Sequence, residues 1–270
     1  MPTPALPITP DVSARLEGKP LVLLLDIDGT LSPIAPRPEY AIVPVATQAV
    51  LTDLAATSGV HVVFVTGRSA VDGRRLVGVE GGWMIGNHGM ELAHPREPAE
   101  ARADVAPFAA RIADAAARIA ALANERSWAG VLIEDKRLTL SAHYRLAHPR
   151  LVPELTAEVT RIADELGLRV TSGKEVLEVR PPIEVNKGTA ALELAESLGA
   201  THDGASLFAA GDDRTDEDLF RVLLAHQPRA VTVRVGESEQ TTTAEFTVSD
   251  PDAMRDLLAG ILTLRRQVAA

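Results

Sequence analysis

The sequence predicts an α/β protein in which a doubly wound parallel sheet is interrupted by an inserted α+β domain. Near both ends of the 270-residue chain, strand-like apolar runs alternate with helical stretches, the pattern that builds parallel sheets covered by helices. In the middle of the chain, pairs of neighbouring strands favour an antiparallel sheet instead. The run Leu21 to Leu25 is apolar without alternation, which is typical of a strand buried on both faces.

The first and last stretches form the two halves of one predicted domain. Each contains strands followed by helices, so both can contribute parallel strands to a single sheet. The expected elements are, in order, a strand over 21–26, a helix after Pro44, a strand over 60–65, a helix after Ser69, a helix over 187–198, a strand over 206–211, a helix from Thr215, a strand over 230–235 and a final helix over 251–266.

The segment between them is predicted to be a separate domain with an antiparallel sheet and two helices. Its expected elements are a helix over 99–123, strands over 131–134 and 137–144, a helix over 149–167, and strands over 168–171 and 176–180. Prolines near residue 95 and at 181–182 place the boundaries, so the main domain covers 19–96 and 182–270 and the insertion covers 97–181. Residues 1–18 are expected to be a flexible leader, because the first ten include four prolines and no secretion signal.

The composition fits a cytoplasmic enzyme with a substantial core. Hydrophobic residues make up 46% of the chain and no stretch approaches membrane-spanning length. The net charge of −10 has the wrong sign for a general affinity for nucleic acid or anionic membranes. The absence of cysteine excludes disulfides, zinc-thiolate sites and cysteine nucleophiles, and is compatible with a reducing compartment.

Two carboxylates follow the first predicted strand, in Asp26-Ile27-Asp28-Gly29-Thr30. Ligand sites in parallel sheets lie beyond the carboxyl ends of the strands. An aspartate there can attack phosphorus and form an acyl phosphate, while a carboxylate two residues later can transfer the leaving-group proton. The alternative is a strand end with an Asx turn, which is common for this pattern.

A second acidic group follows the predicted strand over 206–211, in Gly211-Asp212-Asp213-Arg214-Thr215-Asp216-Glu217. Because parallel strands end at one sheet edge, Asp26 and Asp212 can converge on one hard cation, and Mg2+ suits an all-oxygen site. The alternative is an N-cap group, with Asp213 or Thr215 opening the helix and the following acids favouring its dipole. Both roles can hold together.

Thr66-Gly67-Arg68 and Lys187 are candidates for phosphate binding. Thr66 and the backbone N–H groups beside it come at the start of a predicted helix, where phosphate oxygens bind readily, although an ordinary N-cap has the same pattern. Lys187 also starts a predicted helix, where its charge is mildly unfavourable to the helix dipole. That position favours a function, such as neutralising phosphate, over a solvated side chain.

These motifs, in this order, resemble the four motifs of the haloacid dehalogenase superfamily of phosphohydrolases. Within it, the chain after the leader is similar to trehalose-6-phosphate phosphatases. The additional motifs are Gly86-Asn87-His88-Gly89-Met90-Glu91, Glu134-x-Lys136, His143-Tyr144-Arg145, Gly173-Lys174-x-Val176-Leu177-Glu178-Val179-Arg180-Pro181 and Asn186-Lys187-Gly188. The sequence departs from the family at Ile27, where an aromatic residue is frequent, and at Thr66, where many members have serine; both changes keep the chemistry.

The resemblance implies a Rossmann-like core and a role for each matching core residue. Asp26 would be the nucleophile and a Mg2+ ligand, and Asp28 the general acid and base, which also gives the metal its backbone carbonyl. Asp212 would complete the metal site, and Asp213 and Asp216 would support it. The phosphoryl group would be held by Thr66, Gly67 and Lys187.

The inserted domain would be a cap that closes on the core and selects the substrate. The resemblance implies that sugar hydroxyls contact Glu134, Lys136 and Glu178, and substrate binding is also expected of Arg68, Asn87, His88 and Arg145. Glu134 and Lys136 share one face of a predicted strand, as do Lys174, Val176, Glu178 and Arg180 of another. The alternatives are a solvated sheet face, a turn histidine at His88 and a surface strand end at Arg145.

The expected function is hydrolysis of trehalose 6-phosphate with Mg2+ through an aspartyl phosphate. The alternatives are a phosphatase of another sugar phosphate, such as sucrose phosphate or mannosyl-phosphoglycerate, and a sugar-phosphate sensor without activity. The expected partner is the small substrate alone, with functional coupling to a trehalose-phosphate synthase, and a monomer is favoured.

Overall fold

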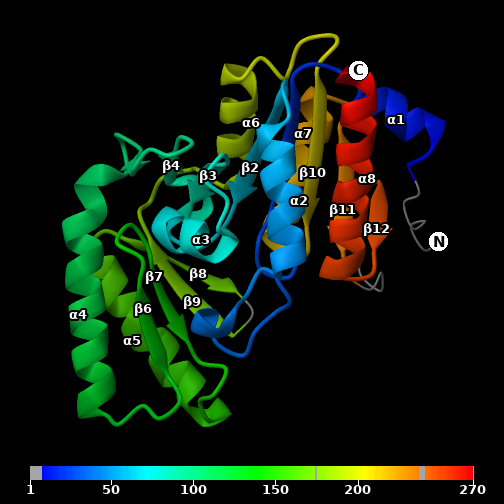
Figure 1. Cartoon of the computed structure of the whole chain (residues 1–270). Helices are drawn as coiled ribbons and strands as arrows, with labels where there is room; N and C mark the ends of the chain where they lie inside the picture. Colours follow the sequence, from blue (N-terminus) through cyan, green and yellow to red (C-terminus); the bar gives the residue numbers. More distant parts are fainter. Residues whose placement is uncertain (1–7, 174, 237–240, 270) are drawn as a thin grey trace. The chain divides into compact units, whose positions relative to one another are not determined.

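The computed structural model describes residues 8–173, 175–236 and 241–269 (Figure 1). The chain divides into two compact units, Met1–Glu100 with Val185–Ala270 and Ala101–Glu184. The boundaries expected from the sequence, after residues 96 and 181, lie within a few residues of this division. We call the first unit the core and the second the inserted unit. Lys174 and residues 1–7 of the expected leader lie outside the described residues.

The core is built on a sheet with the strand order β12-β11-β10-β1-β2-β3-β4-β5. The strands from β12 to β3 pair in parallel, and β4 is antiparallel to β3, so the predicted doubly wound α/β class is confirmed. The strands are β1 (Leu21–Leu25), β2 (Val60–Val65), β3 (Trp83–Gly86), β4 (Glu91–Ala93), β5 (Ala99–Ala101), β10 (Ser206–Gly211), β11 (Val231–Val235) and β12 (Phe246–Val248).

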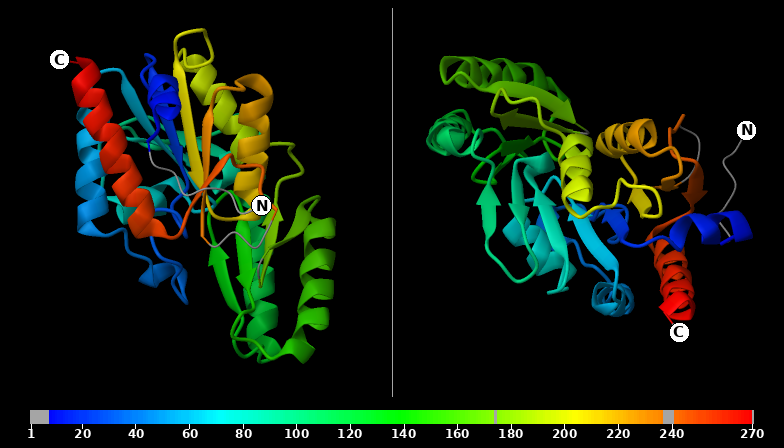
Figure 2. Two further views of the ribbon diagram at one scale, coloured as in Figure 1. Left: turned by 90° about the vertical axis from the view of Figure 1, so that its right-hand side faces the viewer. Right: turned by 90° about the horizontal axis from the view of Figure 1, so that it is seen from above.

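Helices cover both faces of this sheet. In Figure 2, α2 and α8 lie together on one face, and α6 and α7 lie on the other. The helices of the core are α1 (Pro10–Leu16), α2 (Val45–Ala56), α3 (Ala70–Val77), α6 (Lys187–Ser197), α7 (Arg214–His226) and α8 (Pro251–Ala269), with short 3-10 turns η1 (Pro38–Tyr40) and η2 (Asn87–Gly89).

Strand β1 is the centre of the core, and every residue of it is buried. Leu21, Leu23 and Leu25 pack into one apolar cluster with side chains of α2, α3 and α8. Each buried leucine contributes about 1.5–3 kcal/mol relative to an exposed one, so the position of β1 is strongly fixed. Its neighbours are β2 on one side and β10 on the other, so the order of strands along the chain reverses at β1. Loops that follow these strands therefore meet where parallel sheets bind ligands.

The inserted unit has an antiparallel sheet with the order β6-β7-β9-β8, as predicted. One face packs against helices α4 and α5, with Leu177 and Val179 of β9 fully buried there. The elements are η3 (Ala106–Phe108), α4 (Ala109–Glu125), β6 (Leu132–Asp135), β7 (Leu140–His143), η4 (Pro149–Leu151), α5 (Val152–Glu165), β8 (Arg169–Gly173) and β9 (Val176–Arg180).

Two predicted elements of this region start later than expected. The predicted helix over 99–123 begins as strand β5 and the turn η3, and α4 starts only at Ala109. Pro107 explains the difference, because proline lacks an N–H donor and is tolerated only in a first helical turn. The predicted strand over 137–144 begins at Leu140, because Arg137 has a φ of 72° and belongs to the turn before it.

The expectation of a flexible leader through residue 18 is wrong from Pro10 onward. Residues 10–16 form α1, whose N-cap Thr9 accepts a hydrogen bond from the backbone of Val12. Proline at the first helical position fits this start, because its missing N–H would have no partner there. Val12 and Leu16 are buried in the apolar cluster of the core, so α1 is anchored by packing. Among the described helices, none combines the length and apolar character needed to cross a membrane.

Candidate active site

A buried lysine joins two aspartates at the carboxyl edge of the core sheet. Lys187 Nζ lies 2.7 Å from Asp26 Oδ1 and 2.9 Å from Asp216 Oδ1. The three residues come from the end of β1, the start of α6 and the first turn of α7, and each is at most 4% exposed. Lys187 therefore holds its unusual position at a helix start because two carboxylates lie beside it.

Asp212 reaches the same place from the end of β10. Leu25 is in register with Ala210, so Asp26 and Asp212 leave neighbouring strands at nearly the same level. The Asp212 carboxylate packs directly on Gly29, where a Cβ atom would come within 2.2 Å of Oδ2. Gly29 also has a φ of 88°, so the turn after Asp28 requires glycine for two independent reasons.

The site holds more carboxylates than cations, which changes the pKa of each group. Burial, together with Asp212 and Asp213, raises the pKa of Asp26 to about 7 against the opposing charge of Lys187. Burial, with Asp216 and Asp213, likewise raises the pKa of Asp212 to about 7. Burial also raises the pKa of Asp216 well above its ordinary value. A further cation would relieve this excess of negative charge.

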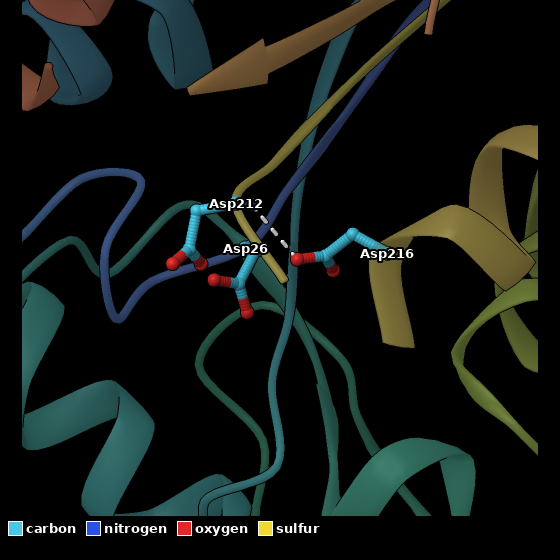
Figure 3. A group of neighbouring side chains, drawn as sticks. All are labelled: Asp26, Asp212 and Asp216. Atoms are coloured by element: carbon cyan, nitrogen blue, oxygen red, sulfur yellow. Dashed lines mark hydrogen bonds between the residues drawn. The ribbon is translucent and has the colours of Figure 1, made fainter. Parts of the chain in front are cut away.

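The donor set fits a hard divalent cation. Carboxylate oxygens of Asp26, Asp212 and Asp216 all lie within 4.8 Å of one another, and Figure 3 shows them converging. Oxygen ligands of this kind suit Mg2+. Asp216 is already engaged at both oxygens, because Oδ1 accepts from Lys187 and Oδ2 from the backbone N–H groups of Asp212 and Asp213. Asp26 and Asp212 therefore fit a ligand role better, and Asp216 fits the supporting role that was predicted for it.

Asp213 is the N-cap of α7, which confirms the capping alternative for this residue. Its side chain accepts hydrogen bonds from the backbone of Thr215 and Asp216, and the Asp216 side chain in turn accepts one from the backbone N–H of Asp213. Burial opposes ionisation here, but the charge of Lys187 and the hydrogen bonds from Thr215 and Asp216 lower the pKa of Asp213 to about 2. Asp213 therefore stays charged and supports the site by fixing the start of α7.

The loop after β2 also opens at this edge, because Leu25 is in register with Phe64. Thr66 is only 1% exposed, and its hydroxyl accepts from the backbone of Arg68 at 3.1 Å. The turn η2 braces the loop, since the backbone N–H of His88 donates to Thr66 and that of Asn87 donates to Arg68. The His88 ring lies against Gly67, where a Cβ atom would come within 2.5 Å of it.

Asn87 was predicted to bind substrate, but the structure buries it completely. Its Nδ2 donates to Glu91 Oε1 at 2.7 Å, and the same oxygen accepts from the backbone of Ala70 at 2.6 Å. Asn87 and His88 both have positive φ, at 48° and 56°, which polar residues in tight turns tolerate. The structure thus places Asn87 and Glu91 as a brace between η2 and the start of α3.

Arg68 was predicted to bind substrate, whereas in the structure its guanidinium binds Asp28. Nε lies 2.6 Å from Asp28 Oδ2 and Nη2 lies 2.7 Å from Oδ1, so both carboxylate oxygens are engaged. Nη2 also donates to the carbonyl oxygen of Pro38 at 3.1 Å. The Asp28 side chain is therefore directed to Arg68, which is compatible with a predicted metal contact that uses only the backbone carbonyl of Asp28.

The inserted unit carries a row of polar side chains on the sheet face opposite its helices. Glu134, Ser141 and Glu178 are paired across β6, β7 and β9. Glu134 Oε2 lies 2.9 Å from His143 Nε2, and Glu178 Oε1 lies 3.5 Å from Lys136 Nζ. We call Glu134, Lys136, Ser141, His143 and Glu178 the polar face.

Ser141 and His143 were not among the predicted site residues. The strand register places them on the polar face, because both alternate along β7 with Leu140 and Ala142, which are buried on the opposite face of the sheet. The Ser141 hydroxyl is buried and has no hydrogen-bond partner among the described residues. Arg145 follows the end of β7 and instead pairs with Glu175 at 2.9 Å, with 39% of its side chain exposed. Both Glu134 and Glu178 lie where the sequence pattern placed them.

Comparison with known proteins gives the chain its family. A profile described as trehalose-phosphatase matches residues 24–252. A probable trehalose-phosphate phosphatase 4 of Oryza sativa subsp. japonica is 31% identical over 95% of this chain and 70% of its own length. A crystal structure of a trehalose-6-phosphate phosphatase related protein matches with a TM-score of 0.79 and 28% identity, over 91% of this chain and 99% of that one.

An uncharacterized glycosyl hydrolase of Mycobacterium tuberculosis (strain H37Rv) is also similar, at 38% identity over 80% of this chain. The chain spans only 16% of the length of that protein. The profile match and the rice relative both extend across the core and the inserted unit. The chain therefore belongs to the trehalose-phosphatase family.

Proposed function

We propose that this protein is a Mg2+-dependent phosphatase that hydrolyses trehalose 6-phosphate to trehalose and phosphate through an aspartyl phosphate. The observation that carries the proposal is the arrangement of Asp26, Lys187 and Asp212 at the sheet edge. Lys187 Nζ lies 2.7 Å from Asp26 Oδ1, and carboxylate oxygens of Asp26 and Asp212 lie within 4.8 Å of each other. Membership of the trehalose-phosphatase family supports this choice of substrate.

In the first step, a carboxylate oxygen of Asp26 attacks phosphorus as the bond from phosphorus to the sugar 6-oxygen breaks. Asp28 gives its proton to that oxygen, so trehalose leaves as a neutral alcohol. In the second step, Asp28 takes a proton from water as the water oxygen attacks the phosphorus of the aspartyl phosphate. The bond from phosphorus to the Asp26 oxygen breaks, which releases phosphate and restores both starting groups.

Positioning and charge neutralisation supply most of the rate in such transfers. Lys187 neutralises the phosphoryl oxygens as well as Asp26, and Thr66 and the Gly67 N–H hold the phosphoryl group. Asp26, Asp212 and the backbone carbonyl of Asp28 would hold Mg2+, which when bound neutralises charge on the phosphoryl group. Asp213 and Asp216 keep α7 and Lys187 in place through the bonds described above.

The polar face recognises the disaccharide. Its two pairs, Glu134 with His143 and Lys136 with Glu178, present both donors and acceptors, which suits hydroxyl groups that need both. Ser141 adds a buried hydroxyl without a partner among the described residues. Contacts of Arg145 and His88 with substrate stay predictions, as do a monomeric state, a cytoplasmic location and coupling to a trehalose-phosphate synthase.

The test is phosphate release with Mg2+ from trehalose 6-phosphate, sucrose 6-phosphate, glucose 6-phosphate and p-nitrophenyl phosphate. A strong preference for the first substrate supports both the chemistry and the role of the polar face. Equal activity over the panel, or preference for sucrose 6-phosphate, contradicts the substrate and keeps the mechanism. No phosphate release, with thermal stabilisation by Mg2+ and a phosphate mimic, contradicts catalysis and favours a sugar-phosphate sensor.

A further inference from the structure

We propose that Arg68 is a positioning residue for Asp28, and that it keeps hold of one carboxyl oxygen while the other exchanges a proton with the leaving group or with water. This inference rests on the proposed role of Asp28 as the general acid and base. It departs from the expectation that Arg68 binds substrate.

The contact between the two side chains is a forked ion pair. Its two distances, 2.6 and 2.7 Å, are at the short end for charge-assisted hydrogen bonds, and two parallel bonds fix the carboxylate plane as well as its position. The bond from Nη2 to the carbonyl oxygen of Pro38 fixes the guanidinium in turn. A fork of this kind holds orientation in a way that a single lysine contact does not.

Burial of the pair is asymmetric. The side chain of Arg68 is 12% exposed, whereas that of Asp28 is 40% exposed. The arginine therefore forms the fixed inner half of the pair, and the carboxylate forms the outer half, which a substrate can reach. An exposed ion pair would contribute little, but this one has a mostly buried partner and two aligned bonds.

The backbone of Arg68 is held at both ends. Its N–H donates to Thr66 Oγ1 at 3.1 Å, and its carbonyl oxygen accepts from the backbone of Asn87 at 2.7 Å. Asn87 is itself held by Glu91. The brace of η2 thus fixes the base of Arg68, and Arg68 fixes Asp28.

The chemistry of Asp28 requires that this pair opens partly. A carboxylate can accept from both guanidinium donors, but a carboxylic acid uses one oxygen to donate its proton. In the acid form, one oxygen therefore stays on Arg68 and the other turns to the leaving oxygen. Arg68 would then act as the pivot that limits where the proton can be delivered.

Substrates with different leaving groups can separate a role of Arg68 in positioning Asp28 from a general role in binding or folding. Nitrophenolate leaves phosphorus without protonation, whereas a sugar alkoxide needs the proton of Asp28. Under single-turnover conditions with Mg2+, Arg68→Met should slow trehalose release from trehalose 6-phosphate by about 10- to 100-fold. Release of nitrophenol from p-nitrophenyl phosphate should change by less than about threefold, since general acid catalysis does not contribute to it. The KM for trehalose 6-phosphate should stay unchanged.

A double-mutant cycle tests whether the two residues act together. Asp28→Asn should show the same split between substrates, and adding Arg68→Met to it should slow trehalose release no further. Arg68→Lys, which keeps the charge and one donor, should recover part of the rate. Arg37→Met, which removes an exposed arginine of an ordinary surface pair with Glu39, is the matched control and should leave both rates unchanged.

Equal losses on both substrates, losses that multiply in the double variant, or a rise in KM alone would overturn the role of Arg68. If Asp28→Asn itself spares trehalose release, the proposed mechanism fails at Asp28 instead, so the two failures are distinguishable. If Arg68→Met does not fold, as judged by its melting curve, Arg68→Lys replaces it in the same double-mutant cycle, and the same comparison of the two substrates is made.

Discussion

The carboxyl edge of the core sheet and the polar face of the inserted unit differ in how their charges are balanced. At the edge, four aspartates surround one lysine, and the charged atoms of Asp26, Lys187 and Asp216 are almost completely buried. On the polar face, carboxylates lie beside cationic or imidazole side chains, Glu134 beside His143 and Glu178 beside Lys136, and the side chains of Glu134 and His143 are 26% and 28% exposed.

This difference fits the proposed division of labour, with chemistry at the core and sugar recognition on the polar face. An unbalanced buried site binds a cation strongly, because the cation relieves an excess of negative charge in a medium of low polarity, and a bound cation can then attract an anionic phosphoryl group. A surface with balanced charges gains little from charge but offers donors and acceptors in fixed positions, which is what hydroxyl recognition requires. Variants of the two regions should therefore fail in different ways.

Asp26→Asn should have the largest effect. The amide keeps the shape but is no nucleophile, so turnover of every substrate should fall by on the order of 10³-fold or more. The melting temperature should not fall, because the change removes one charge from an overcrowded site. Phosphate release and thermal unfolding measure the two quantities, with the exposed Asp114→Asn as control. Retained turnover in Asp26→Asn would contradict its role as nucleophile.

Lys187→Met should damage both activity and stability. Without the ammonium, Asp26 and Asp216 lose their shared partner in a buried site, and removing one partner of a buried pair lowers the free energy of unfolding by up to about 3–5 kcal/mol. Urea unfolding measures this loss. Lys19→Met, at an exposed position, serves as the control. A variant that is as stable as the parent protein would show that the pairs contribute nothing to the fold.

Glu178→Ala should act only on recognition of the sugar. It removes the partner of Lys136 from the polar face, so the KM for trehalose 6-phosphate should rise by about 10- to 100-fold, the range for a hydrogen bond to a charged group. Turnover of p-nitrophenyl phosphate should stay unchanged. The matched control is Glu165→Ala, whose carboxylate pairs with Arg161 on helix α5. An equal loss on both substrates would break the separation between the two regions.

The smallest expected effect is a pH dependence of stability in the metal-free protein. The pKa values of Asp26 and Asp212 rise from 3.8 to about 7 on folding, so the folded state binds more protons than the unfolded state between about pH 4 and 7. Their contribution to the free energy of unfolding therefore falls as the pH rises through this window.

Urea unfolding in EDTA at pH 6 and pH 8 measures this difference, and Asp212→Asn should reduce it. Mg2+ should restore stability mainly at pH 8, where both carboxylates are ionised and free to bind it. A metal-free protein that is more stable at pH 8 than at pH 6, with Asp212→Asn unchanged in this respect, would contradict the charge excess at the core edge.

The location of the core carboxylates and of Lys187 could be predicted because sheet topology fixes it. Unbroken apolar runs in the sequence indicate where the parallel strands end. Asp26 and Asp212 follow such strands, and Lys187 opens a helix at the same edge. The order of these motifs along the sequence indicated the family. The backbone of a parallel sheet leaves few other places for these side chains.

Contacts between loops could not be predicted in this way. The fork between Arg68 and Asp28, and the burial of Asn87 beneath Glu91, depend on turns with positive φ that have no periodic pattern. Ser141 and His143 were missed because a short strand shows its register only when paired. The helix α1 was not predicted because four prolines within residues 1–10 are typical of an irregular segment, although Thr9 before Pro10 fits a helix N-terminus.

The most direct test of the central claim is to trap the covalent intermediate. Protein mixed with trehalose 6-phosphate and Mg2+ is quenched in acid within a single turnover, and its peptides are weighed by mass spectrometry. We predict that the peptide containing Asp26 carries one phosphoryl group, and that Asp26→Asn carries none. Phosphate release without a phosphorylated peptide, or with the phosphoryl group on another residue, would contradict Asp26 as the nucleophile.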